Sequence, residues 1–482
     1  MAVLAYYSIR SKQAYIFRTN YLREITGGSK LISEAFEVLF HEAAKTGLKV
    51  QRAEFDQFSV KALCRAFADG SVQMAEVFQG GGNATVLFDS RDSFRLANAA
   101  FTSGLIRDCP GMTPVCAGID VDLSDGSDYK ADWKRLQEAA GLEKARMLPY
   151  GISELMPFSL QDHNTLQSVE TRMQGRDVSA EAAAKLWAGL ERGNDLDRMV
   201  TEKGVESLLA IVHADGNRMG EKISCLLENA SDYDTCIRLL RDFSRRTEDV
   251  FYGNSREKME KQVQGRLLRW LIHDGDDITF ICNARDALRL TRAYLHAVEE
   301  TGEYSSCAGI CIFHSHYPCY MAYSMAEEAC ESAKKTLRES CSGQGSLVDF
   351  HYIHSGIGRD LDSIRESQGT AQLIARPFRL HRETPGSRLT LEDLDSLAET
   401  VRRVRISRSN IKRFGSSLEI SRQKAHAELT RITARSPELK ELLENISDDE
   451  TIRDGLLYDF SEIFDLWYSD TTGKEGTSCA GL

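Results

Sequence analysis

The sequence lacks any segment suited to crossing or entering a membrane. Among its 482 residues, no apolar run approaches the roughly 20 residues that span a bilayer. The N-terminal apolar run Ala2–Tyr7 is too short for a secretory signal, and no basic region precedes it. We therefore expect no membrane partner and a cytoplasmic location.

Paired cysteines with C-x-x-C spacing are also missing. The twelve cysteines are scattered, and Cys307, Cys311 and Cys319 lie in or near apolar, strand-like sequence. This distribution is typical of reduced, buried thiols in a cytoplasmic protein. No zinc site is predicted from it.

An overall excess of positive charge is absent as well. The formal net charge is −12, so the whole chain is not a binder of polyanions. The charge is uneven, because Arg402–Arg435 holds ten Lys or Arg and two Glu, whereas Glu438–Asp465 holds ten acids and two bases. This pattern predicts an intramolecular contact, a local RNA- or protein-binding face, or two oppositely charged solvated helix faces.

What the sequence does contain is an acidic hairpin signal at Arg269–Cys282 (RWLIHDGDDITFIC). Strand-type apolar residues flank an Asp-Gly turn, and the tip carries Asp274, Asp276 and Asp277. Carboxylates held together repel one another, and hard oxygen ligands favour Mg²⁺ or Mn²⁺. The alternative interpretation is a solvated turn whose residues serve backbone geometry.

A second segment favours the cation interpretation. The apolar run Ser207–Val212 predicts a buried strand, and Asp215 and Gly216 follow it just before helix-forming sequence. A carboxylate beside a helix N-terminus lies near free backbone N–H groups that bind phosphate oxygens. If the two strands are neighbours, Asp215 converges with Asp276 and Asp277, as metal-assisted nucleotidyl transfer requires.

Charged and titratable side chains next to these motifs allow two interpretations each. Arg218 and Lys222 open the predicted helix and are candidates for phosphate contact. His213 and His273 each precede an acidic motif, so either one orients a carboxylate or both are satisfied buried histidines.

The order of predicted elements repeats along the chain. Strands are expected at 2–9, 73–78, 84–88 and 114–121, and again at 207–212, 269–282 (a hairpin), 306–313 and 348–353. Helices are expected at 30–44, 92–106, 132–145, 179–192, 219–250, 285–300 and 320–338, with a glycine-rich joint at Thr26–Ser29. A helical C-terminal region begins behind a capping signal at Thr390–Asp393.

The repeat also shows in residues, since Cys116–Ile119 recurs as Cys307–Ile310 (CAGI). Two related α+β units are predicted. The first unit has Gly80–Asn83 at its hairpin tip and only Ser8–Arg10 after its first strand, so it lacks the carboxylate pair. The expected arrangement is a pseudo-dimer with one acid cluster near the join.

Six motifs in this order resemble those of a known family. They are QAYIFRTNYLREITGGSKLISE at 13–34, QGGGN at 79–83, ADGNRMG at 214–220, HDGDD at 273–277, CAGICIFHSHYP at 307–318 with AEEACESAKK at 326–335, and RPF at 376–378. The family is that of the large palm-domain polymerase-cyclase subunit of type III CRISPR effector complexes, related more distantly to GGDEF cyclases. The resemblance spans nearly the whole chain.

The resemblance implies a fold of two ferredoxin-like palm domains forming a pseudo-dimer, with a helical linker and a helical C-terminal domain. The expected boundaries are 1–147 for a degenerate first palm, 148–204 for the linker, 205–380 for the second palm and 381–482 for the helical domain. The first palm begins at Met1, so no HD nuclease domain is expected ahead of it.

The resemblance also implies an enzyme, a Mg²⁺- or Mn²⁺-dependent nucleotidyltransferase that converts ATP into cyclic oligoadenylate-type messengers in an antiviral response. Catalytic and metal-binding roles fall on Asp215, Asp276 and Asp277. Nucleotide-binding roles fall on Gly216, Asn217, Gly220, Gly275 and Lys334; for Lys334 the alternative is a solvated helix lysine.

The implied partners are ATP and, through the C-terminal helices, guide or target RNA and CRISPR effector subunits. Two alternatives are a catalytically weakened scaffold subunit and a stand-alone palm cyclase with another trigger or product. Four features depart from the family pattern: Asn217 replaces an acid, Asp274 replaces a glycine, zinc-binding cysteines are missing from Phe158–Glu170, and an HD nuclease domain is not expected before the first palm.

Overall fold

The computed structural model describes most of the chain. The described residues are 1–468 without 54–57, 81, 125, 148–157, 190–195, 197–198, 203–205, 264–266, 341–342, 355–359, 368, 370–371 and 383–387. The predicted boundaries at 147/148 and 204/205 border such gaps and stay predictions.

The first unit is built on a five-stranded sheet. Its strands are β1 (Ala2–Arg10), β2 (Val50–Gln51), β3 (Met74–Gly80), β4 (Asn83–Phe88) and β5 (Thr113–Val121), in the spatial order β2-β3-β4-β1-β5. If the short β2 is left out, the spatial order of the strands is that of a ferredoxin-like fold, and each strand is antiparallel to its neighbours.

The second unit repeats this plan in a six-stranded sheet. Its strands are β8 (Leu208–Gly216), β9 (Arg269–Asp274), β10 (Asp277–Asn283), β11 (Ser306–His314), β12 (Leu347–Tyr352) and β13 (Phe378–Arg379), in the order β13-β12-β11-β8-β10-β9. The part β11-β8-β10-β9 corresponds to β5-β1-β4-β3 of the first sheet. The predicted two-unit α+β fold is therefore confirmed.

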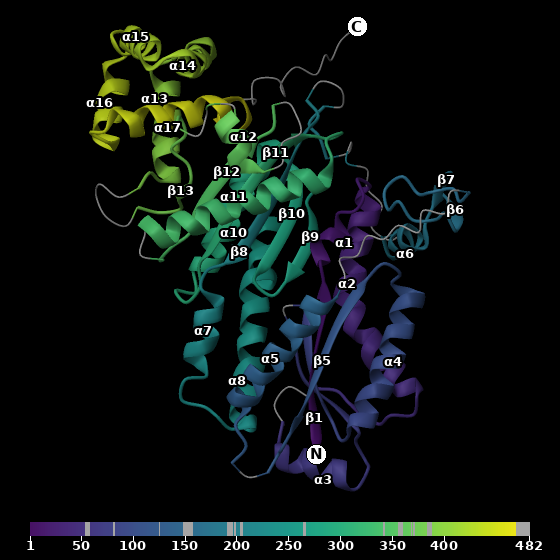
Figure 1. The fold of residues 1–482 in the computed structure, drawn as a ribbon. Helices are drawn as coiled ribbons and strands as arrows, with labels where there is room; N and C mark the ends of the chain where they lie inside the picture. The colour runs from purple at the N-terminus through teal and green to yellow at the C-terminus, as the bar shows by residue number, and fades with distance from the viewer. Residues whose placement is uncertain are drawn as a thin grey trace, which may run out of the picture.

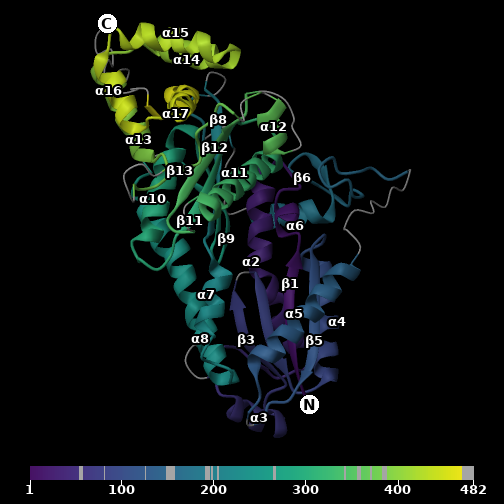
Figure 2. The same cartoon turned by 60° about the vertical axis from the view of Figure 1, so that its left-hand side comes forward.

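Helices cover both sheets (Figures 1 and 2). Those of the N-terminal part are α1 (Lys12–Ile16), α2 (Leu22–Lys45), α3 (Val60–Ala68), α4 (Arg91–Asp108), α5 (Tyr129–Arg146) and α6 (Ala180–Gly189), with the short strands β6 (Thr171–Met173) and β7 (Arg176–Val178) ahead of α6. Those of the second unit are α7 (Met219–Leu226), α8 (Tyr233–Glu248), a π-helix at Asp249–Asn254, α9 (Ser255–Glu260), α10 (Ala287–Glu299) after a 3-10 turn at Ala284–Asp286, α11 (Cys319–Ser340) and α12 (Leu361–Ser367).

The register of the two sheets shows how closely the units correspond. In the first sheet, Cys116 of the CAGI segment lies opposite Tyr7 of β1. In the second sheet, Cys307 of the repeated segment lies opposite Asp215 of β8. Tyr7 therefore stands where the second unit has Asp215, and a buried aromatic side chain replaces a carboxylate there.

The two units share hydrophobic cores instead of meeting at a thin interface. Helix α8 of the second unit packs on the first sheet, where the Arg241 Nε donates to the Val77 carbonyl oxygen at 2.7 Å. On another face, Phe17 of the first unit stacks on Tyr323 of α11 with ring centroids 4.2 Å apart. Apolar burial of this extent fixes the units relative to each other.

Two expectations about helices are wrong. Helix α2 runs without interruption through Gly27 and Gly28, where a joint was predicted. The reason is tertiary: a Cβ atom at Gly27 would lie 1.8 Å from the Lys185 carbonyl oxygen, so glycine lets α6 approach. The helix expected at 219–250 is broken in two at 227–232, between α7 and α8.

The C-terminal region is helical, as expected. Its helices are α13 (Leu391–Arg403), α14 (Arg408–Ile420), α15 (Arg422–Thr433), α16 (Pro437–Ile446), α17 (Glu450–Ile463) and a final π-helix at Phe464–Tyr468. The predicted cap of α13 is present as a capping box between Thr390 and Asp393. No helix of the described residues is long and apolar enough to cross a membrane.

Charges of opposite sign meet inside this region. Arg408 of the basic block donates to both carboxylate oxygens of Asp465 at 2.5 and 2.7 Å, and Lys412 lies 3.2 Å from the same carboxylate. Of the three interpretations of the uneven charge, the intramolecular contact is therefore realised. A buried arginine, Arg376, ties α17 to the second sheet through Glu462 at 2.5 Å and Asp349 at 3.8 Å.

Candidate active site

The acidic hairpin forms as predicted, with Asp274 and Asp277 paired across its end. Its loop is therefore Gly275–Asp276, and Gly275 has φ +68°. A two-residue loop with glycine in this conformation at its first position matches the right-handed twist of the strands. The turn thus brings Asp276 to the tip and leaves Asp277 as the first residue of β10.

Asp215 lies beside this tip because β8 pairs with β10. The predicted strand ended at Val212, but β8 continues to Gly216. Asp215 is therefore itself a strand residue, one position before the end of β8. A Cβ atom at Gly216 would lie 2.8 Å from both Cβ and Oδ2 of Asp276. Glycine at 216 therefore allows the hairpin tip to close against β8.

Burial and mutual repulsion perturb the three carboxyl groups. Burial raises the pKa of Asp277 well above its ordinary value, and the nearby Asp215 and Asp274 raise it further. Burial, the charge of Asp215 and a hydrogen bond with it raise the pKa of Asp276 as well. Such shifts are typical of functional carboxylate clusters.

Lys334 comes from α11 and reaches this cluster. Its Nζ donates to Asp215 Oδ2 at 2.5 Å and to the Gly216 carbonyl oxygen at 3.1 Å. Burial opposes its charge, but the Asp215 carboxylate outweighs this effect and raises the pKa of Lys334. The alternative of a solvated helix lysine is wrong, since only 15% of the side chain is exposed.

The two histidines have different surroundings. Burial lowers the pKa of His213 to about 4, so its imidazole is neutral at pH 7. Its Nδ1 lies 3.0 Å from Thr279 Oγ1 and 3.4 Å from Asp277 Oδ1. His273 instead stacks on Tyr252 with ring centroids 4.5 Å apart. His213 is thus a buried histidine that pairs with Thr279 and lies beside Asp277.

The donor set has the chemistry that Mg²⁺ or Mn²⁺ requires. Asp277 Oδ1 is buried and has no hydrogen-bond partner among the described residues, and a cation would satisfy it. Among those residues, however, no group of three or more His, Cys, Asp or Glu side chains converges closely enough to hold a metal ion. Asp215 is bound by Lys334 in this arrangement.

A cavity of about 550 Å³ separates the hairpin from the first unit. Asp274, Gly275, Asp276 and Asp277 form one wall, and the other described lining residues are Lys12, Gln13, Ile16, Ser29, Ile32, Ser33, Phe36, Gln79, Gly80, Gly82, Ser244, Glu248, Tyr252, Ile272 and His273. The volume falls within the range of small-molecule sites, about 300–1,000 Å³. Asp215 and Lys334 lie just outside this lining.

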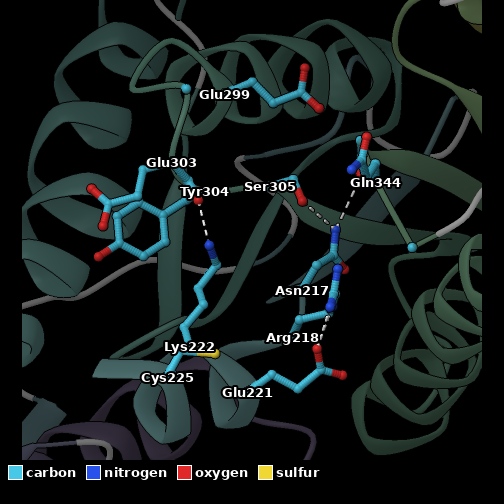
Figure 3. Close-up of a pocket in the computed structure, with 13 residues that line it drawn as sticks. Asn217, Arg218, Glu221, Lys222, Cys225, Glu299, Glu303, Tyr304, Ser305 and Gln344 are labelled. Carbon is cyan, nitrogen blue, oxygen red and sulfur yellow. Dashed lines mark hydrogen bonds and ion pairs between the residues drawn. The ribbon is translucent and has the colours of Figure 1, made fainter. Parts of the chain in front are cut away.

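Asn217 lines a different cavity, of about 610 Å³, together with Arg218 and Lys222 (Figure 3). Its Nδ2 donates to Ser305 Oγ and to the Gly345 carbonyl oxygen, both at 3.0 Å. From the sequence alone, residues 215 and 217 are predicted to share one side of an extended chain. The prediction is wrong because β8 ends at Gly216, and the two side chains bind separate partners.

The remaining candidates near α7 also lie away from the carboxylates. Arg218 pairs with Glu221 at 2.5 Å, and Lys222 Nζ donates to the Glu303 carbonyl oxygen at 2.5 Å (Figure 3). Gly220 has open space around it, since a Cβ atom there would meet nothing within 4 Å. Phosphate contact by these residues stays a prediction.

Lys12 also belongs to this region, although the sequence did not predict it. Lys12 of α1 donates through Nζ to Asp274 Oδ2 at 2.9 Å, across 262 positions of sequence. No local pattern could reveal this pair, because it depends on how the two units dock.

Comparisons with known proteins confirm the family resemblance. Residues 208–342 match the family described as Cas10/Cmr2, second palm domain. Comparison with curated proteins gave no match. Solved structures with a similar fold include three crystal structures of the Csm1–Csm4 cassette. For the complex with cA4 the TM-score is 0.51 at 13% identity, covering 95% of this chain and 69% of that chain.

For the apo cassette the TM-score is 0.51 at 14% identity, with 95% and 70% of the two chains covered. For the complex with one ATP it is 0.50 at 14% identity, with 95% and 69% covered. At these identities the similarity is one of fold, and it extends along nearly the whole chain.

Proposed function

Because its second unit is a Cas10/Cmr2-type palm, we propose that the chain is a nucleotidyltransferase that joins ATP into cyclic oligoadenylate-type messengers. The observation that carries this proposal is the carboxylate cluster of Asp276 and Asp277 on a cavity of nucleotide size, with Asp215 and Lys334 directly behind it. The solved cassettes with a similar fold include one in complex with ATP and one in complex with cA4.

Asp215, Asp276 and Asp277 would hold Mg²⁺ or Mn²⁺, which would neutralise triphosphate charge and favour ionisation of the attacking 3′-hydroxyl. Lys334 keeps its ammonium beside Asp215 and is placed to bind phosphate oxygens. Neutral His213 lies 3.4 Å from Asp277 Oδ1 on the buried side of the cluster. Gly216 and Gly275 keep the backbone free of side chains where the strands meet the tip.

We further propose that the protein works in an RNA-guided CRISPR effector assembly in the cytoplasm. The solved structures with a similar fold are of a two-protein cassette, Csm1–Csm4. The C-terminal helices are the proposed contact for effector subunits and RNA. A stand-alone cyclase with another trigger is the alternative arrangement.

Two observations favour a second candidate function, a scaffold subunit with weakened catalysis. Lys334 already neutralises Asp215, and three metal donors do not converge among the described residues. A scaffold would bind effector subunits through the C-terminal helices while turning over little or no ATP.

The test is to incubate the purified chain, alone and with its effector complex and target RNA, with each NTP and Mg²⁺ or Mn²⁺. Mass spectrometry of the products should show cyclic oligoadenylates formed from ATP, and the Asp276→Asn/Asp277→Asn variant should form on the order of 10³-fold less. Assembly without any product in either metal would favour the scaffold.

A further inference from the structure

The first unit contributes a charged side chain to the hairpin of the second unit. Lys12 Nζ and Asp274 Oδ2 lie 2.9 Å apart, and their side chains are 19% and 27% exposed. Lys12 is the only Lys or Arg in the described lining of the 550 Å³ cavity, where Asp274 and three other acids stand. The pair therefore joins the two walls of the cavity near its acidic end.

Lys12 is carried on a firmly held element. Helix α1 has only five residues, but its Tyr15 and Ile16 are 2% exposed in the core that the two units share. The Tyr15 carbonyl oxygen accepts a hydrogen bond from the buried ammonium of Lys185 at 2.5 Å, and Glu181 pairs with the same ammonium at 2.6 Å. The position of α1 is thus fixed by buried contacts.

Asp274 is the last residue of β9 and pairs with Asp277 across the end of the hairpin. Fixing Asp274 therefore fixes the strand end opposite Asp277, with Asp276 in the two-residue loop between them. A hairpin tip has few neighbours of its own, so an ion pair at its base restricts its motion.

The tip of the first hairpin is shaped around this ion pair. Gly82 has φ +61°, and a Cβ atom there would lie 1.6 Å from Lys12 Nζ and 2.3 Å from Asp274 Oδ2. Only glycine combines this conformation with such a close approach. Three segments far apart in sequence thus meet at one point.

We propose that Lys12 and Asp274 form an inter-unit clasp that positions the Asp276–Asp277 tip, so that the first unit is a positioning element of the active site. This inference rests on the proposed function for its catalytic consequence. It explains why an acid stands at 274, where the resembling family has glycine: the charge has a partner on the first unit.

The experiment uses the full chain with Lys12→Met, Asp274→Asn, the double variant, and Lys12→Arg as the conservative replacement. Lys130→Met is the matched control, because Lys130 also joins the two units, through the Glu228 carbonyl oxygen at 3.1 Å. Amide hydrogen exchange of Arg269–Cys282 is measured together with Mg²⁺-dependent ATP turnover and thermal stability.

Each single variant should speed exchange at the tip by about fivefold and lower kcat by a similar factor, while KM changes by less than about twofold. The double variant should match the single variants, because both remove one interaction. Lys12→Arg and the control Lys130→Met should both show the exchange rate and the turnover of the wild type.

Unchanged exchange at the tip, additive effects in the double variant, or faster exchange along the whole chain would overturn the clasp. If the wild type forms no product at all, the proposed function fails, but hydrogen exchange still decides whether the clasp holds the tip. Gly82→Ala provides an independent disruption from the first unit and should reproduce the exchange result.

Discussion

The two palm units have the same strand order and register but different residues at equivalent positions. The first unit has Tyr7 opposite the cysteine of its CAGI segment, and the second has Asp215 there. The first hairpin ends in Gly80–Asn83, of which Gly81 lies outside the described residues, whereas the second ends in Asp274–Asp277. A common scaffold therefore serves two roles, one of support and one of proposed chemistry.

The largest loss of activity is expected when the carboxylates of the second tip are removed. Asp276→Asn/Asp277→Asn should lower ATP turnover on the order of 10³-fold, about 4 kcal/mol of barrier, because charge that binds the cation is lost. Product formation and Mg²⁺-dependent ATP binding are the measurements. Asn83→Ala at the first tip is the matched control, and an equal loss there would contradict the division of roles.

Closing of the hairpin against β8 offers a subtler test. In Gly216→Ala, the added methyl group would lie 2.8 Å from Asp276, so the tip must shift. Turnover should fall about 10- to 100-fold, since small displacements of reacting groups have large effects on rate. Gly141→Ala in α5 is the control, because a Cβ atom there meets nothing within 4 Å. Equal rates in both variants would show that the close approach is unimportant.

Asn217 of the second unit has buried contacts that a single substitution can test. Asn217→Asp replaces the donor that binds Ser305 and the Gly345 carbonyl oxygen with an acceptor, at a buried position. The variant should lose about 1–3 kcal/mol of unfolding free energy. Urea denaturation measures this loss. Asn445→Asp is the control, because Asn445 is exposed. Faster turnover with unchanged stability would show instead that residue 217 faces the carboxylates.

The smallest effect concerns His351 on β12, a buried histidine of the second unit. Burial and the charges of Arg376 and Arg365 lower its pKa to about 3. An unfolded chain takes up a proton below about pH 6.5, and the folded chain does not, so stability is lost as the pH falls. At pH 5.5 the loss is roughly 1.4 kcal/mol relative to neutral pH.

His351→Gln should abolish this part of the pH dependence. Urea unfolding at pH 7.5 and 5.5 measures the difference for each variant. His41→Gln serves as control, because His41 is exposed on α2 of the first unit. An unchanged pH dependence in His351→Gln would show that the histidine is protonated in the folded chain.

Much of this fold follows from local sequence. Strand-like runs such as Ala2–Ile9 and the Asp-Gly turn at 274–275 predicted the strands and the hairpin, because apolar pattern and turn chemistry are local properties. The proximity of Asp215 to the hairpin followed from assuming that two strands are neighbours. It could not have followed from either segment alone.

The errors share a tertiary origin. Gly27 and Gly28 look like a helix break, but they admit α6 against α2. Asn217 looks like a weakened ligand, but its amide ties the end of β8 to the loops before β11 and β12. The partner of Asp274 lies on another unit. In each case the decisive contact comes from a distant segment, which local preferences do not report.

The packing of α8 limits how this protein can be divided or recombined. Tyr233, Cys236 and Ile237 of α8 are buried in a core with Leu4 and Val77 of the first sheet. A chain cut between the units would leave this apolar face without its cover, and each fragment would need a substitute to remain soluble. A chimera that exchanges the first unit with that of a relative must therefore carry a matching α8. The unit to exchange in protein engineering is the first sheet together with α8, which packs on it from the second unit.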